Sequence, residues 1–246
     1  MVLRTGDTST PQTNYKTSNY CIAYLDILGA SKKIENDKDF DFLNHLNMFM
    51  VDAISESGNG IFKRQEEMKI KIFSDNILIA LKLNPEDSKR DFKIGVLFNA
   101  VANIYNEILR YGYLMRGSIV EGEFFQNDII VYGKALIEAV KLEEETAKVP
   151  RILVKTEVSE NYKKYYLMKD QDDELFLNIF NLCEWCDNYT FKFNLLEMLK
   201  ENKDNEKIKT KIMWMIGYYN SWFGEYEYRI TKRQKITEEE IKRTIQ

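Results

Sequence analysis

Histidine and cysteine are scarce in this sequence, with one histidine and three cysteines in 246 residues. Catalysis by a serine–histidine or cysteine–histidine pair therefore has little support. Cys183 and Cys186 form a Cys-x-x-Cys motif, but no second pair completes the four ligands of a structural zinc site. We expect two helical thiols there. His45 lies in an amphipathic helical pattern; a general base is one interpretation, and a surface or interface histidine is the better one.

Long apolar runs and a strong charge bias are also missing. No segment approaches the roughly 20 apolar residues that a membrane span needs, and no signal peptide is visible, so we expect no membrane association. The net charge of −4 argues against stable nucleic-acid binding. Three cysteines without a secretory signal favour a reducing, cytoplasmic location.

Two acidic residues stand out, each at the end of an otherwise apolar strand. Asp26 follows the run Ile22–Leu25, and Asp75 lies in Ser-Asp-Asn between two β-rich runs, a composition typical of a tight hairpin turn. A carboxylate among apolar neighbours is costly unless a cation lies beside it. Two such acids are the minimum that holds Mg²⁺ or Mn²⁺ against a phosphate.

The hydrophobic periodicity predicts an α+β fold with a ferredoxin-like, or palm, βαββαβ core. In that topology the end of the first strand and the central hairpin lie side by side, which would bring Asp26 and Asp75 together. The expected strands are 20–28, 68–73, 77–83, 113–120, 129–132 and 151–155. The expected helices run from 31 or 37 to 55, from Asn84 and Pro85 to 111 with Gly112 as C-cap, and over 135–147.

The chain divides into three parts on composition. Residues 1–18 are polar, and we expect a flexible tail; residues 19–157 carry the predicted core. Residues 158–246 alternate charged and aromatic helical stretches, notably 209–223, and end in a short charged helix over 237–246. We expect this mainly helical extension to pack on the core or on a dimer partner.

A series of motifs resembles the class III nucleotidyl cyclases, and more closely the pyrimidine cyclases of the bacterial Pycsar antiphage system. The motifs occur in the expected order between residues 20 and 155: YLDILG at 24–29, FSD at 73–75, MRGSI at 115–119, YG at 132–133, GKALIEAVKLE at 133–143 and AKVPRI at 147–152.

The resemblance implies a nucleotidyl cyclase catalytic domain over 19–157 and a homodimer with active sites at the subunit interface. It implies that Asp26, Asp75 and the carbonyl of Ile27 hold two Mg²⁺ or Mn²⁺ ions. The 3′-hydroxyl of a nucleoside triphosphate would attack its own α-phosphorus and release pyrophosphate.

Phosphate contacts are expected from backbone amides at a helix start and from basic side chains. Each of the basic side chains also has a plain interpretation as a surface ion pair. The candidate amides belong to Leu28, Gly29, Ala30 and Ser31; the candidate side chains are Arg116, Lys141 and Arg151.

Departures from the purine cyclases favour the pyrimidine branch. Lys71 stands where adenylate cyclases place a base-reading lysine, but Ile130 replaces its polar partner. Ile137 and Lys141 replace the usual asparagine and arginine, and a lysine cannot form the bidentate fork. The expected products are cyclic UMP or cyclic CMP, which in the defence family are second messengers that switch on a separate effector protein.

Three alternatives stay open. A palm-fold module could bind a nucleotide or a dimer partner without turnover, as the missing asparagine–arginine pair suggests, although retaining two unneutralised acids speaks against it. Another palm enzyme, such as an oligonucleotide-forming polymerase, is possible; the hairpin does not read Gly-Gly-Asp-Glu-Phe, which disfavours a diguanylate cyclase. Finally, Asp26 and Asp75 could be incidental turn acids.

Overall fold

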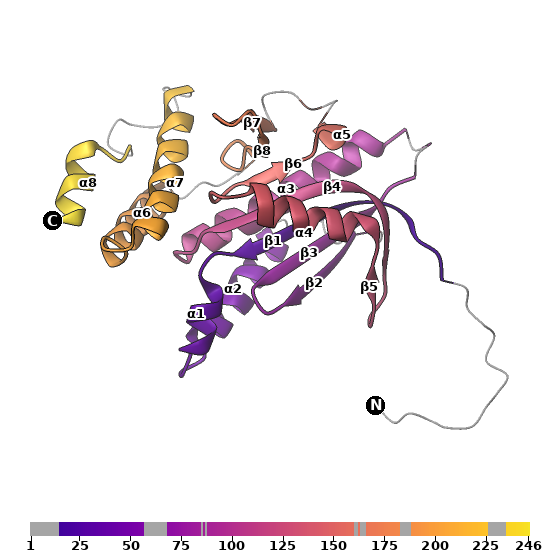
Figure 1. Ribbon diagram of the computed structural model, residues 1–246, viewed down its shortest axis with the longest axis horizontal. Coiled ribbons are helices and arrows are strands. Elements are labelled where there is room, and N and C mark those ends of the chain that lie inside the picture. The colour runs from indigo at the N-terminus through magenta and orange to yellow at the C-terminus, as the bar shows by residue number, and fades with distance from the viewer. Residues whose placement is uncertain are drawn as a thin grey trace.

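The computed structural model describes residues 15–56, 68–84, 86, 88–159, 162, 166–182, 188–225 and 235–246. Helices and strands alternate through the first two thirds of the chain, and helices dominate the last third (Figure 1). The strands are β1 Ser18–Ile27, β2 Met68–Phe73, β3 Asn76–Lys82, β4 Met115–Gln126, β5 Val131–Tyr132, β6 Ile152–Val154, β7 Leu167–Lys169 and β8 Leu175–Leu177. The helices are α1 Ala30–Glu35, α2 Asp41–Glu56, α3 Arg90–Arg110, α4 Lys134–Thr146, α5 Thr156–Ser159, α6 Asn188–Glu201, α7 Glu206–Glu225 and α8 Glu238–Ile245.

The first four strands form the core of the sheet. They lie in the order β2-β3-β1-β4, and every neighbouring pair among them is antiparallel. Helices α1 and α2 connect β1 to β2, and α3 connects β3 to β4. This is the ferredoxin-like βαββαβ arrangement, so the predicted α+β palm fold is confirmed.

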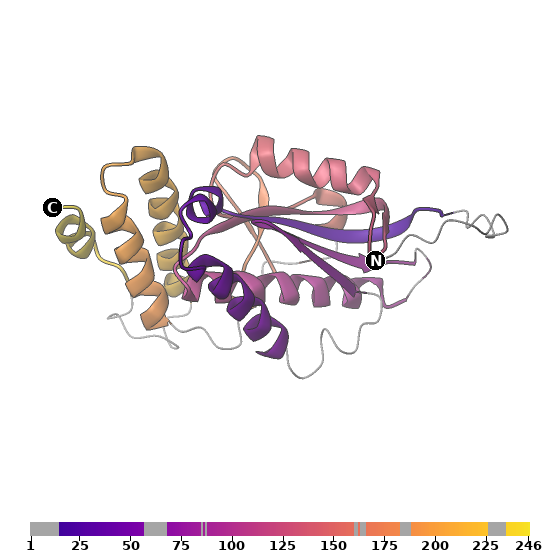
Figure 2. The same cartoon turned by 90° about the horizontal axis from the view of Figure 1, so that it is seen from below.

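Helices cover both faces of this sheet (Figure 2). Alternate β1 residues Ile22 and Tyr24 face α4, where Ala135 and Ala139 pack. The intervening residues, such as Ala23 and Leu25, belong to the larger core that includes α2 and α3. Because successive strand residues point to opposite faces, Asp26 lies on the α4 face.

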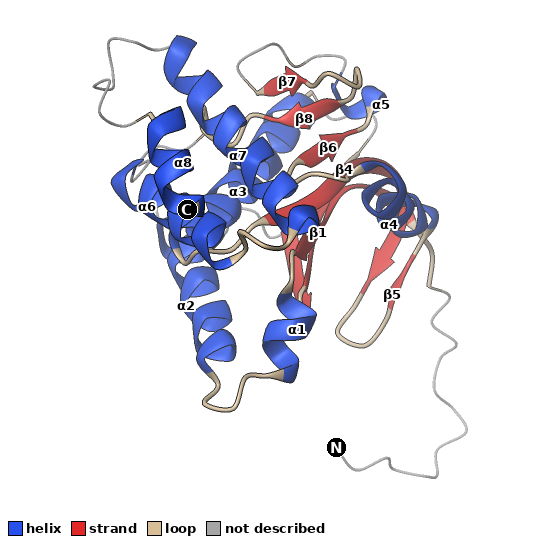
Figure 3. Ribbon diagram, turned by 60° about the vertical axis from the view of Figure 1, so that its left-hand side comes forward, coloured by secondary structure: helices blue, strands red, loops and turns tan. Residues whose placement is uncertain are grey.

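The C-terminal part extends the sheet as well as adding helices. Strand β6 runs parallel to β4, and β8 and β7 continue the sheet beyond it. Helix α6 contacts α3, α7 and α8, and the three C-terminal helices gather at one end of the sheet (Figures 1 and 3). The first strand points toward this end (Figure 1).

Two helix starts differ from the prediction for local reasons. Between α1 and α2 the chain turns at Phe40, whose φ is 59°, and the Asp37 carboxylate accepts hydrogen bonds from the amides of Phe42 and Leu43. The predicted helix start at Asn84 is wrong, because the amide of Leu83 still donates to the Asn19 carbonyl at 2.9 Å and keeps the chain extended.

Other boundaries shift by a few residues. Strand β4 continues through Gly122 to Gln126 because it pairs with β1 and then with β5. Gly112 follows α3 with a φ of 76°, as expected of a glycine just past a helix end. The predictions for Cys183, Cys186, Pro85 and most of the N-terminal tail lie outside the described residues.

Candidate active site

Asp26 ends a row of side chains that crosses the sheet on its α4 face. Its cross-strand partners are Asn76 on β3 and Arg116 on β4. Arg116 donates from Nε to Oδ2 of Asp26 at 3.0 Å, and the Asp26 side chain is 18% exposed. The cation that a carboxylate here requires is thus supplied by the next strand.

Asp75 lies beside Asp26 at the same end of the sheet, in the turn between β2 and β3. The amide of Ile27 donates to the Asp75 carbonyl at 3.0 Å. The Asp75 carboxylate accepts from the Ser31 hydroxyl and from Nδ2 of Asn76, both at 3.2 Å. Two acids that are 49 residues apart in the sequence therefore lie side by side, at the ends of neighbouring strands.

Gly117 allows β1 and β4 to come close at this end of the sheet. A Cβ atom at this position would overlap the backbone oxygen of Tyr24 and lie 2.9 Å from Cδ2 of Leu25. The arginine–glycine pair in the fourth strand thus has a steric explanation. Gly117 brings the strands together, and Arg116 then reaches Asp26.

Glu143 is the site residue that sequence reasoning missed. It lies on α4 with its side chain 3% exposed, and its Oε1 is 2.5 Å from Nε of Arg116. That Nε donates to Asp26, and Glu143 Oε1 is buried with no hydrogen-bond partner. Burial raises the pKa of Glu143 from 4.5 to about 7; Arg116 opposes the shift and Asp26 adds to it. Its spacing of four residues from Ala139, on the sheet-facing side of the helix, was the available signal.

Tyr24 completes the neighbourhood. Its hydroxyl donates to Oδ1 of Asn76 at 2.5 Å. Burial, followed by the negative charges of Glu143, Asp26 and Asp75, raises the pKa of Tyr24 to about 12. The phenol therefore stays protonated at neutral pH and keeps Asn76 oriented toward Asp75.

The donor set suits a hard divalent cation. Asp26, Asp75 and the Ile27 backbone offer only oxygen ligands, which Mg²⁺ and Mn²⁺ prefer. Arg116 occupies one oxygen of Asp26. Across the described ranges, no cluster of three or more His, Cys, Asp or Glu side chains forms a metal-binding group, so a cation here needs backbone, water or substrate oxygens besides the two acids.

The loop after β1 holds the predicted phosphate-binding residues. Gly29 precedes α1 with a φ of 77°, a conformation that favours glycine. The Leu28 amide already donates to the Leu114 carbonyl at 2.8 Å. The Ser31 hydroxyl contacts Asp75, so this loop and the hairpin turn are joined directly.

Lys71 lies on the site face of the sheet, one row further from the acids. It pairs with Leu78, which in turn pairs with Tyr24. Its ammonium donates to the Asp128 carbonyl at 2.8 Å, in the loop between β4 and β5.

The other two predicted basic residues lie elsewhere. Lys141 is exposed on α4, four residues after Ile137, which is 71% exposed. Arg151 is 3% exposed and pairs with Asp170 and Asp172 at the β7–β8 turn. The structure therefore groups Asp26, Asp75 and Arg116, and leaves Lys141 and Arg151 outside that group.

A cation from the C-terminal extension approaches the cluster. Burial, then the positive charges of Arg116 and Lys207, lowers the pKa of Lys211 on α7, while Asp26 and Glu143 raise it. Lys211 is half-buried. The C-terminal helices thus contribute charge near the sheet end that carries the two acids.

No protein-family model matches this chain, and no curated protein matches it. Among solved structures, it is similar to the catalytic core of a rhodopsin-guanylyl cyclase with converted specificity in complex with ATPαS, with 14% identity over 67% of this chain and 97% of that one, at a TM-score of 0.49. It is also similar to the guanylate cyclase domain of RhGC from Catenaria anguillulae in complex with GTP, with 14% identity over 66% and 95% of the two chains, at a TM-score of 0.47. A third is the non-canonical dimeric guanylyl cyclase domain of the RhoGC fusion protein from the aquatic fungus Blastocladiella emersonii, with 13% identity over 66% and 94%, at a TM-score of 0.47.

Proposed function

We propose that this chain is a metal-dependent nucleotidyl cyclase that converts UTP or CTP to the 3′,5′-cyclic nucleotide and pyrophosphate. The observation that carries the proposal is the meeting of Asp26 and Asp75 at one end of a βαββαβ sheet. The ordered cyclase-like motifs between residues 20 and 155 support it.

Asp26, Asp75 and the Ile27 carbonyl are the proposed ligands of two Mg²⁺ or Mn²⁺ ions. When bound, such ions neutralise the α-phosphate and lower the pKa of the attacking 3′-hydroxyl. The chain's own part is positional: Ser31 and Asn76 hold the Asp75 carboxylate, and Arg116 holds that of Asp26.

Phosphate charge is the second requirement. Amides of Gly29, Ala30 and Ser31 open α1, where the first helical amides have no intrahelical acceptor. Leu28 contributes by fixing the loop, since its amide is used by Leu114. Arg116, which bonds Asp26 in the structure, is the proposed side-chain contact to a phosphate oxygen.

A homodimer would bring the remaining cations to the site. Lys141 and Ile137 share the exposed side of α4, which supports the proposal that Lys141 acts on the active site of a second copy. The exposed apolar residues Ile129, Ile130 and Tyr132 of the β4–β5 hairpin are the proposed dimer contact. For Arg151 we propose a structural role, because it pairs with Asp170 and Asp172.

Base selection is proposed to favour pyrimidines. Lys71 faces the site side of the sheet, but Ile130, which replaces the polar partner of purine cyclases, offers no hydrogen bond to a base. The cyclic product would act in the cytoplasm as an antiphage second messenger on a separate effector protein. No helix in the described residues has the length and apolar character to cross a membrane.

A second candidate is a cyclase-like module that binds nucleotide without turnover. It is favoured by Arg116, which neutralises Asp26 without any metal, and by Ile137 and Lys141 in place of an asparagine and an arginine. In this case Asp26 and Asp75 serve only to hold the strand ends together through their hydrogen bonds.

The test is product analysis with each of ATP, GTP, CTP and UTP in Mn²⁺ or Mg²⁺, read by mass spectrometry. We expect cyclic UMP or cyclic CMP from the wild type, and at least a hundredfold loss of product in Asp26→Ala and Asp75→Ala. Asp39→Ala, which removes an exposed acid between α1 and α2, is the matched control. Oligonucleotide products would indicate a polymerase-like enzyme, and metal-dependent binding without any product would identify the binding module.

A further inference from the structure

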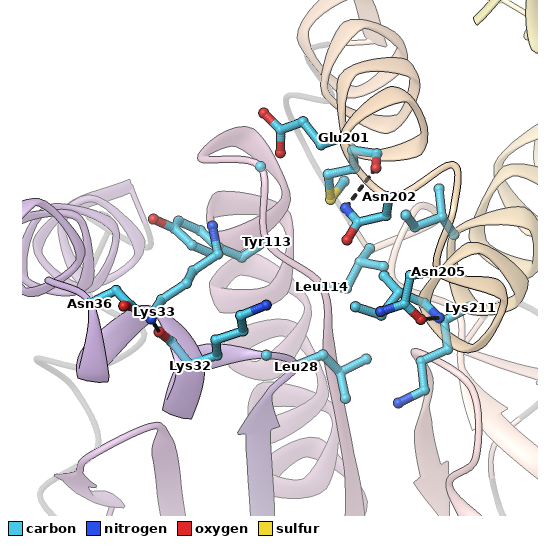
Figure 4. Close-up of a pocket in the computed structure, with 15 residues that line it drawn as sticks. Leu28, Lys32, Lys33, Asn36, Tyr113, Leu114, Glu201, Asn202, Asn205 and Lys211 are labelled. Atoms are coloured by element: carbon cyan, nitrogen blue, oxygen red, sulfur yellow. Dashed lines mark hydrogen bonds between the residues drawn. The ribbon is translucent and has the colours of Figure 1, made fainter. Parts of the chain in front are cut away.

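A cavity of about 400 Å³ separates the loop after β1 from the C-terminal helices. Its walls come from three places: residues 28–36, the turn before β4 at 112–114, and the α6–α7 region from 198 to 212. Figure 4 shows side chains from these segments around a common space. The volume is within the range of small-molecule sites.

The charge of this cavity is predominantly positive. Lys32 and Lys33 of α1 and Lys211 of α7 line it, against a single acid, Glu201. The Lys32 side chain reaches toward the space between α1 and the C-terminal helices (Figure 4). The Lys33 ammonium lies 4.5 Å from the centre of the Tyr113 ring, where a cation–π contact holds it at the wall.

Lys211 strengthens this charge argument. It is half-buried and lines the cavity; burial, then the cations Arg116 and Lys207, lowers its pKa, while Asp26 and Glu143 raise it. An anion in the cavity would favour the charged form of Lys211.

The remaining walls of the cavity suit the organic part of a ligand rather than an inorganic ion alone. Leu28, Leu114 and Ile212 provide apolar surface, and Tyr113 provides an aromatic ring. Several asparagine amides, among them Asn205, add hydrogen-bonding groups. Apolar walls with a few convergent polar groups are typical of ligand sites.

We propose that this cavity binds a small organic phosphate of about mononucleotide size. The phosphate would lie among Lys32, Lys33 and Lys211, and the organic part against Tyr113 and the apolar wall. Several separate ammonium groups fit a multiply charged phosphate better than a single carboxylate.

The cavity adjoins the candidate active site and shares Leu28 and Gly29 of the loop after β1 with it. Neither Asp26, Asp75 nor Arg116 lines it. The Leu28 amide donates to the carbonyl of Leu114, another lining residue, and the Gly29 amide is one of those proposed above to contact the substrate phosphates. A ligand in the cavity would therefore contact the loop that follows Asp26.

Isothermal titration calorimetry of the full chain tests the proposal. EDTA in the buffer removes divalent metal, so that neither turnover nor metal-dependent binding contributes to the measured heat. The probes are inorganic phosphate, ribose 5-phosphate and a panel of nucleoside 5′-monophosphates, which distinguishes a nucleotide from a sugar phosphate. We expect at least one organic phosphate to bind more tightly than inorganic phosphate, with an affinity that falls as salt rises.

Two double variants that remove the same number of charges distinguish binding in the cavity from a general effect of the protein's net charge. Lys32→Ala/Lys33→Ala should weaken binding at least tenfold. Lys38→Ala/Lys242→Ala removes two exposed lysines that do not line the cavity, and should change the affinity less than twofold. Thermal melts of both variants check that they fold.

Three outcomes would overturn the proposal. The first is no heat from any probe at millimolar concentration, and the second is equal weakening in the two double variants. The third is a comparable loss of affinity in Asp75→Asn, which would place the anion at the candidate active site instead.

Discussion

The buried carboxyl group of Glu143 makes a quantitative prediction about stability and pH. Replacing it by glutamine, in Glu143→Gln, keeps the size of the side chain and removes its ability to ionise. The wild-type side chain is 3% exposed and lies 2.5 Å from Nε of Arg116. Burial raises its pKa from 4.5 to about 7, so the folded protein retains a proton that the unfolded chain releases.

The sign of the effect follows from this difference in proton binding. Between pH 4.5 and 7 the native state binds more protons at this position, so the free energy of unfolding falls as pH rises. The contribution of Glu143 is complete below pH 4.5 and is lost as pH rises through about 7. Raising this pKa from 4.5 to about 7 corresponds to about 3.4 kcal/mol.

Urea denaturation of wild type and Glu143→Gln at pH 5 and pH 8, without divalent metal, measures this contribution. The difference in unfolding free energy between the two proteins should shift by about 2.5 kcal/mol between these pH values, in favour of the variant at high pH. Glu145→Gln, which removes an exposed acid from the same helix, is the matched control. A difference that is the same at both pH values would refute the assignment of a raised pKa to Glu143.

Two further predictions concern packing near the strand ends, each read from chemical denaturation. Gly117→Ala should destabilise the fold by about 2 kcal/mol, because the added methyl group overlaps the β1 backbone. Gly217→Ala, in α7 with open space around it, should instead be neutral or stabilising by about 0.5–1 kcal/mol; equal effects would contradict the steric argument. Arg151→Ala should cost about 3 kcal/mol, because it removes the partner of Asp170 and Asp172, and a loss below about 1 kcal/mol would show that water replaces the arginine.

The position of the two acids could be predicted from the sequence because each lies at the end of a strand that its own hydrophobic pattern identifies. A buried strand, a helix, and a hairpin with a short polar turn can form few topologies. The βαββαβ topology among them brings Asp26 beside Asp75. The same reasoning explains Arg116, whose strand had to lie next to β1 on the other side.

Long-range charge pairing could not be read from the sequence. The sequence predicts phosphate contacts for both Arg151 and Lys141, yet Arg151 is buried against acids of the β7–β8 turn and Lys141 is exposed. Which acid pairs with which base depends on how the extension folds back, and no periodicity encodes that. Glu143 lies in the GKALIEAVKLE motif, but the sequence does not show that its carboxylate is buried beside Arg116.

The ion pair between Arg116 and Asp26 has a consequence for handling the protein. In many small metal-binding domains the ligands repel one another when the ion is removed, so a chelator unfolds them. Here the guanidinium of Arg116 already balances Asp26, and the Ser31 hydroxyl and the Asn76 side-chain amide donate to Asp75. The folded scaffold should therefore survive purification in EDTA, and the proposed activity should return when Mg²⁺ or Mn²⁺ is added.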